Sequence, residues 1–322
     1  MRKILILAAI FALFCSQEVR AVEFTPKERQ SLELIQKVKA FAPTLNLGPT
    51  KNFEKFEEGG KKYNFLYYHL KENIPFSYLD TTMKFAKCPY DNLADNWLCL
   101  VINGVNTDDY DVFLYPAIAA AGGTIITRRL LDADSMYLAS AVIHEDFHDN
   151  IHLPRHMDEA AATLVGIVGA GLSFGLGEAR TRQIINNELD DSNDVIYCHQ
   201  RLVDLAQLYA SGKINFQSYE SEKRRLGTLF RFDRPNAAKV AFLHSYRYYF
   251  PLMCRLFYAL NGDLARFVQV MKQAPALPPS LNAPVPETGE TREITGFELH
   301  RYFETNILEP YFEAMIKNQP AK

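Results

Sequence analysis

His144, Glu145 and His148, within the segment from Ala141 to His148, are the residues whose types and spacing most clearly indicate chemistry. Side chains four positions apart lie on one face of an α-helix, so both imidazoles can reach a single ion. Glu145 is rotated by one position, where it can take a proton from water without binding the ion. Imidazole nitrogens are common zinc ligands, and zinc lowers the pKa of a bound water to about 7. The pattern therefore predicts a hydrolytic Zn²⁺ site.

The residues around this motif predict that its helix is buried. The flanking apolar side chains are Leu138, Ala141, Val142, Ile143 and Phe147. A buried imidazole without a partner is costly, and a shared metal ion would remove that cost. Asp132 and Asp134 precede the helix and can cap its first turn.

A third protein ligand is expected, because a catalytic zinc site uses three side chains and keeps one position open. Pro154 cannot continue a helix, so the chain turns there and a second helix begins near Asp158. Glu159 then lies in the first turn of that helix, which returns toward the first one. We favour Glu159 as the third ligand, with Asp158 as a cap or as a partner of a ligand. The competing candidates are His152, His156 and Asp158.

Hydrolysis of a peptide also needs a general base and a group that stabilises the charge developing on the carbonyl oxygen. Glu145 is predicted to be the base and to pass its proton to the leaving amine. The cluster at 244–250 offers His244, Tyr246 and Tyr249 for the second role. Each of these three side chains would serve equally well in the core.

Hydrophobic patterns indicate the elements that must position these residues. Residues 25–41 predict a helix with Thr25 as its cap and Pro26 at its first position. Aromatic and branched residues predict strands at 63–70, 96–103, 112–118 and 124–128. The predicted helices after Asp134 are 136–152, 157–174, 176–190, 194–211, 216–228, 235–260 and 262–273. The strand at 124–128 would offer an edge to which an extended substrate could pair.

These elements predict an α+β domain over 22–272, with a small mixed sheet at about 63–129 and a helical part at 134–272. Residues 273–291 are rich in proline and predict a surface loop. Residues 292–322 predict a C-terminal helix from about 295 to 318. The nearly uncharged stretch 160–176 contains several glycines and predicts a buried, closely packed helix rather than a membrane span.

The first 21 residues are typical of a secretory signal peptide. Arg2 and Lys3 precede an apolar run at 4–14, and Val19-Arg20-Ala21 fits a cleavage site. We therefore expect an exported protein, periplasmic or secreted, with membrane association only if this segment is retained as an anchor. The net charge of −3 and the absence of a dense run of Lys and Arg argue against a nucleic-acid partner.

Four cysteines follow the predicted signal segment, and an even number in an oxidising compartment suggests two disulfides. Cys88–Cys99 would close a short segment, and Cys198–Cys254 would then join two helices. The alternative is that these residues are buried free thiols.

The motif and the residues that follow it resemble a bacterial family of zinc aminopeptidases that is defined by sequence and is similar to the gluzincins, in which the third ligand is Glu. The segments that carry the resemblance are His144-Glu145-Asp146-Phe147-His148 and Asp158-Glu159, which Ala-Ala-Ala-Thr-Leu-Val-Gly166 follows. The likeness covers about 110–272. Asp146 and Phe147 replace the small apolar pair usual inside this motif, and Asp158 replaces a common Asn.

The resemblance implies a zincin-like metallopeptidase that binds Zn²⁺ through His144, His148 and Glu159 and acts on a peptide or protein as an aminopeptidase. No residue is identified for holding a free amine, so a cell-envelope endopeptidase with the same site is the second hypothesis. A non-catalytic zinc-binding envelope protein is the third. A closed sphere of four ligands, with His152 or His156 added, would favour it.

Overall fold

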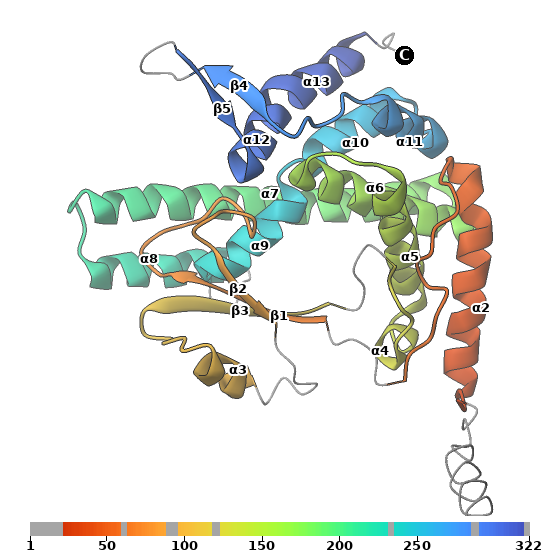
Figure 1. The fold of residues 1–322 in the computed structure, drawn as a ribbon, viewed down its shortest axis with the longest axis horizontal. Helices are drawn as coiled ribbons and strands as arrows, with labels where there is room; N and C mark the ends of the chain where they lie inside the picture. The colour runs from red at the N-terminus through yellow and green to blue at the C-terminus, as the bar shows by residue number, and fades with distance from the viewer. Residues whose placement is uncertain are drawn as a thin grey trace, which may run out of the picture.

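The computed structural model of the chain describes residues 22–58, 63–87, 96–117, 123–230, 235–284 and 290–318. Helices make up most of these residues, and two small antiparallel sheets accompany them. Figure 1 shows the larger sheet beneath the long helix α7 (Glu178–Ala210), while helix α2 (Pro26–Phe41) stands at one end of the molecule. The predicted α+β class is confirmed at this level, and the predicted signal segment lies outside the described residues.

Helix α2 begins where the sequence predicts. The Thr25 hydroxyl accepts a hydrogen bond from the Glu28 backbone N–H at 3.2 Å, and the Glu28 carboxylate accepts one from the Thr25 N–H at 2.7 Å. This capping box satisfies donors that the helix itself leaves free. Pro26 occupies the first turn, where its missing N–H has no cost. After a 3₁₀ turn (Ala42–Leu45), the chain runs beside helix α5 (Ser135–Asn150), against which α2 packs.

Strands β1 (Tyr63–Leu70), β2 (Lys84–Lys87) and β3 (Tyr110–Ala117) form the larger sheet in the order β2-β1-β3. Both pairings are antiparallel, so the prediction of a mixed sheet is wrong for the described strands. The predictions at 63–70 and 112–118 are confirmed to within a few residues, and β2 was not predicted.

Two of the four predicted strands are wrong. Residues 96–103 form helix α3 (Asn96–Ile102), because a short apolar run suits a buried strand and a short helix equally well. Its Cys99 packs with Leu66 of β1 and covers one face of the sheet. Residues 124–128 make only one parallel bridge, between Phe56 and Ile126, before helix α4 (Arg128–Leu131) begins. The substrate-pairing edge expected there is therefore not a strand.

The helical part is confirmed in outline, with corrections at two predicted boundaries. The helices are α5, α6 (Arg155–Ser173), α7, α8 (Phe216–Leu229), α9 (Ala237–Arg247), α10 (Phe250–Ala259) and α11 (Leu264–Gln273). Residues 176–211 were predicted as two helices, but α7 is continuous. Near the predicted break, Ser192 is buried and its hydroxyl donates to the Glu188 carbonyl one turn earlier. Residues 235–260 are two helices, since Pro251 begins a new one.

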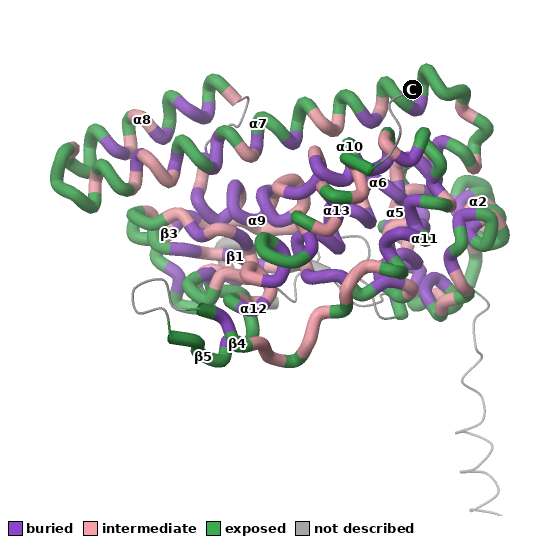
Figure 2. The backbone as a smooth tube through the Cα atoms, turned by 90° about the horizontal axis from the view of Figure 1, so that it is seen from above, coloured by how far each residue is buried: buried purple, intermediate pink, exposed green. Residues whose placement is uncertain are grey.

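Buried residues concentrate in α5, α6, α9 and α10, whereas α7 and α8 present long exposed faces (Figure 2). Helix α7 connects the two ends of the molecule, because it packs on α6 and α10 in one part and on α8 and α9 in another. No helix among the described residues is long and apolar enough to span a membrane.

The C-terminal segment is part of the main core. Strand β4 (Leu281–Pro284) lies within the predicted proline-rich loop and pairs antiparallel with β5 (Thr291–Ile294), which begins at the last residue of that loop. Helices α12 (Gly296–Phe303) and α13 (Glu309–Lys317), joined by a π-helical turn (Glu304–Leu308), replace the single predicted helix. The buried core that contains α5 and α6 also includes Phe303, Leu308 and Phe312.

One predicted disulfide is wrong. Cys198 and Cys254 are buried free thiols, because the former belongs to the small core between α7 and α8 and the latter to the main core. Cys99 is disulfide-bonded, but its predicted partner Cys88 lies outside the described residues, so that pairing stays a prediction.

Candidate metal centre

The two helices that carry the site begin in different ways. Asp134 caps α5, because its carboxylate accepts hydrogen bonds from the backbone N–H groups of Met136 and Tyr137 at 2.9 and 3.2 Å. Asp132, the other predicted cap, lies at the end of α4 instead. Helix α6 starts at Arg155, directly after Pro154, so Asp158 lies inside it rather than at its start.

Glycine allows α5 and α6 to approach closely beside the motif. A Cβ atom on Gly166 would lie 2.8 Å from the Ser140 carbonyl oxygen and 3.3 Å from His144 Cβ. A Cβ atom on Gly169 would lie 2.9 Å from the Ile143 side chain. A larger residue at Gly166 would collide with the α5 backbone, and one at Gly169 would require the Ile143 and Leu45 side chains to move. The glycines therefore permit the close packing of α5 and α6 beside the histidines.

Three potential ligand atoms meet between the two helices. His144 Nε2 lies 3.0 Å from His148 Nε2, and Glu159 Oε2 lies 3.3 and 3.4 Å from these two nitrogens. His148 and Glu159 are buried, and His144 is partly exposed. The structure thus brings together the three residues that the sequence predicts as metal ligands.

The geometry of this triangle fits zinc. Tetrahedral zinc with bonds of about 2.0–2.1 Å separates its ligand atoms by about 3.3 Å, close to the three distances observed. Glu159 Oε2 is fully buried and has no hydrogen-bond partner among the described residues. This oxygen can therefore offer its lone pairs to a cation placed between it and the two imidazole nitrogens.

Asp158 orients one of the histidines. The Nδ1–H of His148 donates to Asp158 Oδ2 at 2.6 Å, which turns Nε2 toward the other two ligand atoms. Burial lowers the pKa of His148, but Glu159 and the bond to Asp158 outweigh it and raise the pKa to about 10. A metal ion must therefore displace a proton from this ring, so binding should strengthen as the pH rises.

The second oxygen of Glu159 is held by two side chains that the sequence did not indicate. Arg155 lies 2.8 Å from Glu159 Oε1, and the Tyr78 hydroxyl donates to the same atom at 3.3 Å. Arg155 also donates from Nε to the Tyr78 oxygen at 2.7 Å. Because Oε1 is occupied in this way, Glu159 can offer Oε2 alone as a ligand.

Glu145 lies beside the triangle without belonging to it. Its carboxylate oxygen Oε2 is buried and has no hydrogen-bond partner among the described residues. Burial raises the pKa of this carboxyl group, and His144 and His148 act in the opposite direction. A buried carboxylate with a free oxygen at the edge of a metal site can accept a proton from water.

A cavity of about 610 Å³ opens on these residues. One wall is aromatic and comes from the sheet and helix α9, with Phe65, Tyr67, Tyr115, Phe242 and Tyr246. Glu188 of α7 and Arg247 of α9 also line it and pair with each other. Burial lowers the pKa of Arg247 to about 10.

Of the three residues predicted as candidates for stabilising the oxyanion, one lines the cavity. Tyr246 lines the cavity, and burial followed by the Glu159 charge raises the pKa of its phenol well above the usual value. His244 does not line it, because its ring is buried and Nδ1 bonds the Phe76 carbonyl at 2.8 Å. Tyr249 is buried and its hydroxyl accepts from Arg301 at 3.4 Å. His244 instead holds the segment that carries Tyr78 to the site.

Neither competing histidine joins the site. His152 is exposed at the turn between the helices. His156 is fully buried, and its Nδ1 lies 2.9 Å from Glu304 of the C-terminal segment. Among the described residues, the potential metal-binding group thus contains three side chains, which leaves a position open for a water molecule or a substrate.

Of the two residues that hold Glu159, Arg155 could have been found from the sequence and Tyr78 could not. Arg155 stands four residues before Glu159, a spacing that indicates an ion pair on a helix, whereas no local pattern marks Tyr78.

Comparison of the chain with protein-family models, with curated proteins and with solved structures gives no match. Function is therefore inferred from the side chains of the site and their geometry.

Proposed function

We propose that this protein is an exported, zinc-dependent metallopeptidase with a zincin-like arrangement. The observation that carries the proposal is the triangle of His144 Nε2, His148 Nε2 and Glu159 Oε2, with edges of 3.0, 3.3 and 3.4 Å. The free oxygen of Glu145 beside it supports hydrolysis, and the N-terminal sequence pattern supports export.

The residues of the site divide the work of hydrolysis. His144, His148 and Glu159 would hold Zn²⁺, which when bound supplies a Lewis acid and lowers the pKa of water. Glu145 takes the proton of the attacking water and delivers it to the leaving amine. Tyr246 is the side chain proposed to donate to the developing oxyanion, because it lines the cavity and lies near Glu159.

A catalytic role is favoured over a purely structural zinc site. A structural site uses four protein ligands and excludes water. His152 is exposed and His156 is bound to Glu304, so neither completes such a sphere. A cavity lined by aromatic residues also supports binding of a peptide.

The charges in the cavity favour cleavage of internal peptide bonds. An aminopeptidase needs a carboxylate that is free to hold the substrate ammonium group. Among the described residues lining the cavity, Glu159 pairs with Arg155, Glu188 pairs with Arg247, and Glu145 is assigned as the base. This distribution supports the endopeptidase hypothesis over the aminopeptidase activity that the resemblance implies.

Metal content tests the proposal. Purified wild-type protein should hold about one zinc ion per chain and hydrolyse an unstructured protein such as casein, with loss of hydrolysis on chelation and recovery on adding Zn²⁺. Glu159→Ala should lose zinc because it removes a ligand, whereas Glu178→Ala, an exposed glutamate on α7, should retain it. A zinc-free wild type, or a Glu159→Ala variant with normal zinc, would refute the assignment.

Peptides with free and blocked ends distinguish the two modes of cleavage. An endopeptidase should cleave an N-acetylated, C-amidated peptide with apolar side chains at a rate within a few-fold of that of the free peptide. The reason is that its site does not need to bind the charged terminal groups of the substrate. The measurement is the ratio of kcat/KM for the two peptides, with the cleaved bond identified by mass spectrometry. Cleavage of the free peptide alone, at its first bond, would favour the aminopeptidase.

A further inference from the structure

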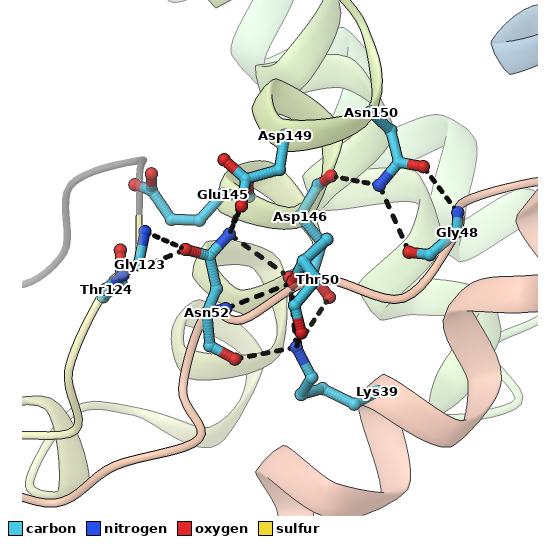
Figure 3. Close-up of polar contacts among 10 residues, drawn as sticks. All are labelled: Lys39, Gly48, Thr50, Asn52, Gly123, Thr124, Glu145, Asp146, Asp149 and Asn150. Atoms are coloured by element: carbon cyan, nitrogen blue, oxygen red, sulfur yellow. Dashed lines mark hydrogen bonds and ion pairs between the residues drawn. The ribbon is translucent and has the colours of Figure 1, made fainter.

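Asn52 is not one of the three potential metal ligands and does not line the cavity, but its side chain is hydrogen-bonded to the backbone of Glu145, the predicted base. It follows the loop after α2 and is fully buried. Its Nδ2 donates to the Glu145 carbonyl oxygen at 3.0 Å and to Asp149 Oδ2 at 3.1 Å, as Figure 3 shows. Its Oδ1 accepts from the backbone N–H groups of Gly123 and Thr124 at 3.0 and 2.9 Å. One side chain therefore joins α5 to the chain segment that leads into α4.

Asp146, one of the two residues that depart from the usual motif, belongs to the same network. Asp146 Oδ1 accepts from the Thr50 hydroxyl and, at 3.3 Å, from Lys39 Nζ of α2. Lys39 also donates to the Asn52 backbone carbonyl at 2.7 Å. The four polar residues of the motif thus have separate roles, since the two histidines face α6, Glu145 borders the cavity, and Asp146 binds the N-terminal segment.

The backbone next to Asn52 is strained. Phe53 has φ of 59°, a left-handed conformation that is rare for a bulky residue. Its N–H donates to the Thr124 carbonyl at 2.6 Å and its side chain is buried. A turn of this kind persists only where surrounding contacts fix it, and here it brings the Asn52 amide between two segments.

We infer that Asn52 is a positioning residue that fixes the Glu145 backbone against residues 123–124, so that the carboxylate of Glu145 is held at the metal centre. The inference rests on the proposed function only for its catalytic consequence. The coupling between the two segments follows from the contacts alone. A base displaced by even about 1 Å can lose about 100-fold in rate while substrate binding is little changed.

Asn150 provides a matched control. It lies on the same helix, and its amide also docks the N-terminal segment, with Nδ2 donating to the Asp146 and Gly48 carbonyls and Oδ1 accepting from the Gly48 N–H. It has no contact with Glu145 among these bonds. Asn150→Ala therefore removes two hydrogen bonds between α5 and the N-terminal segment and one within α5, but none to residues 123–124 and none to Glu145.

The test compares Asn52→Ala and Asn150→Ala by hydrogen exchange and by kinetics. In Asn52→Ala, the amides of Gly123 and Thr124 should exchange at least about 10-fold faster, and kcat should fall about 10- to 100-fold with KM within about 3-fold and zinc affinity unchanged. In Asn150→Ala, these amides and kcat should stay near wild-type values. Asn52→Ser, which keeps a polar side chain but removes the amide and adds no charge beside Asp149, should reproduce the fall in kcat if Asn52→Ala does not fold.

The outcomes separate this inference from the proposed function. Unchanged exchange at 123–124 in Asn52→Ala, or equal losses of kcat in the Asn52 and Asn150 variants, would overturn the positioning role. An inactive wild type would overturn the proposed function and the catalytic consequence together, while exchange would still decide the coupling. An active wild type beside fully active Asn52 variants would overturn this inference alone.

Discussion

Replacing Glu145 by Gln is expected to abolish peptide hydrolysis and to leave zinc bound. The substitution keeps the size of the side chain but removes its ability to accept a proton, and general-base catalysis contributes about 10²- to 10⁴-fold to rates. Glu145 is not one of the three side chains whose atoms meet at the ligand triangle, so metal affinity should stay within about 3-fold of wild type. The measurements are kcat/KM on a blocked peptide and zinc content of the same preparations.

Two control measurements would show that the loss of hydrolysis comes from the missing base. Wild type and variant should unfold at the same temperature, because Glu145 Oε2 makes no hydrogen bond among the described residues. Tyr246→Phe should retain zinc and lose a smaller part of the activity, about 10- to 100-fold, since it would remove only one donor to the oxyanion. Full hydrolysis by Glu145→Gln would show that another group is the base, and loss of zinc would identify Glu145 as a ligand.

The local part of the site could be predicted from the sequence because helical spacing and chain turns determine it. His144 and His148 share a helix face at any i, i+4 spacing, and Pro154 requires a turn that returns Glu159 toward them. The small residues before Gly166 indicated a close approach of two helices, as the structure bears out. Each of these conclusions needed no information from beyond about 25 residues.

The remaining part could not be predicted because distant segments supply it. Tyr78 reaches Glu159 from the loop after β1, and Asn52 reaches Glu145 from the loop after α2. His244 has the right chemistry for a site residue, but its ring bonds the carbonyl of Phe76. Which of several aromatic or polar residues faces the metal depends on tertiary packing, and hydrophobic periodicity contains no signal for it.

The C-terminal segment is the clearest example of a distant segment that supports the site, because it satisfies the first turn of α6, the helix that carries Glu159. Pro154 cannot cap α6 with a side chain. Glu304, from the π-helical turn, instead accepts from the His156 backbone N–H at 3.0 Å and from His156 Nδ1 at 2.9 Å. Arg301 pairs with the same carboxylate at 3.0 Å. A residue near the end of the chain therefore satisfies the first turn of α6, three residues before Glu159.

Glu304→Ala should consequently lower the free energy of unfolding by about 3–5 kcal/mol, because it leaves the fully buried His156 and the helix N–H without an acceptor. Zinc affinity should fall with it, since the turn that precedes Glu159 is loosened. Urea unfolding of the chelated protein and competition for zinc with a chelator measure the two effects, and Glu304→Gln, which keeps the size, should lose less of each. Glu298→Gln is the matched control, because Glu298 lies in the same segment in an exposed pair with Arg292 and should change stability by less than about 1 kcal/mol. If Glu304→Ala were as stable as Glu298→Gln, the C-terminal helices would cover the core without supporting the metal centre.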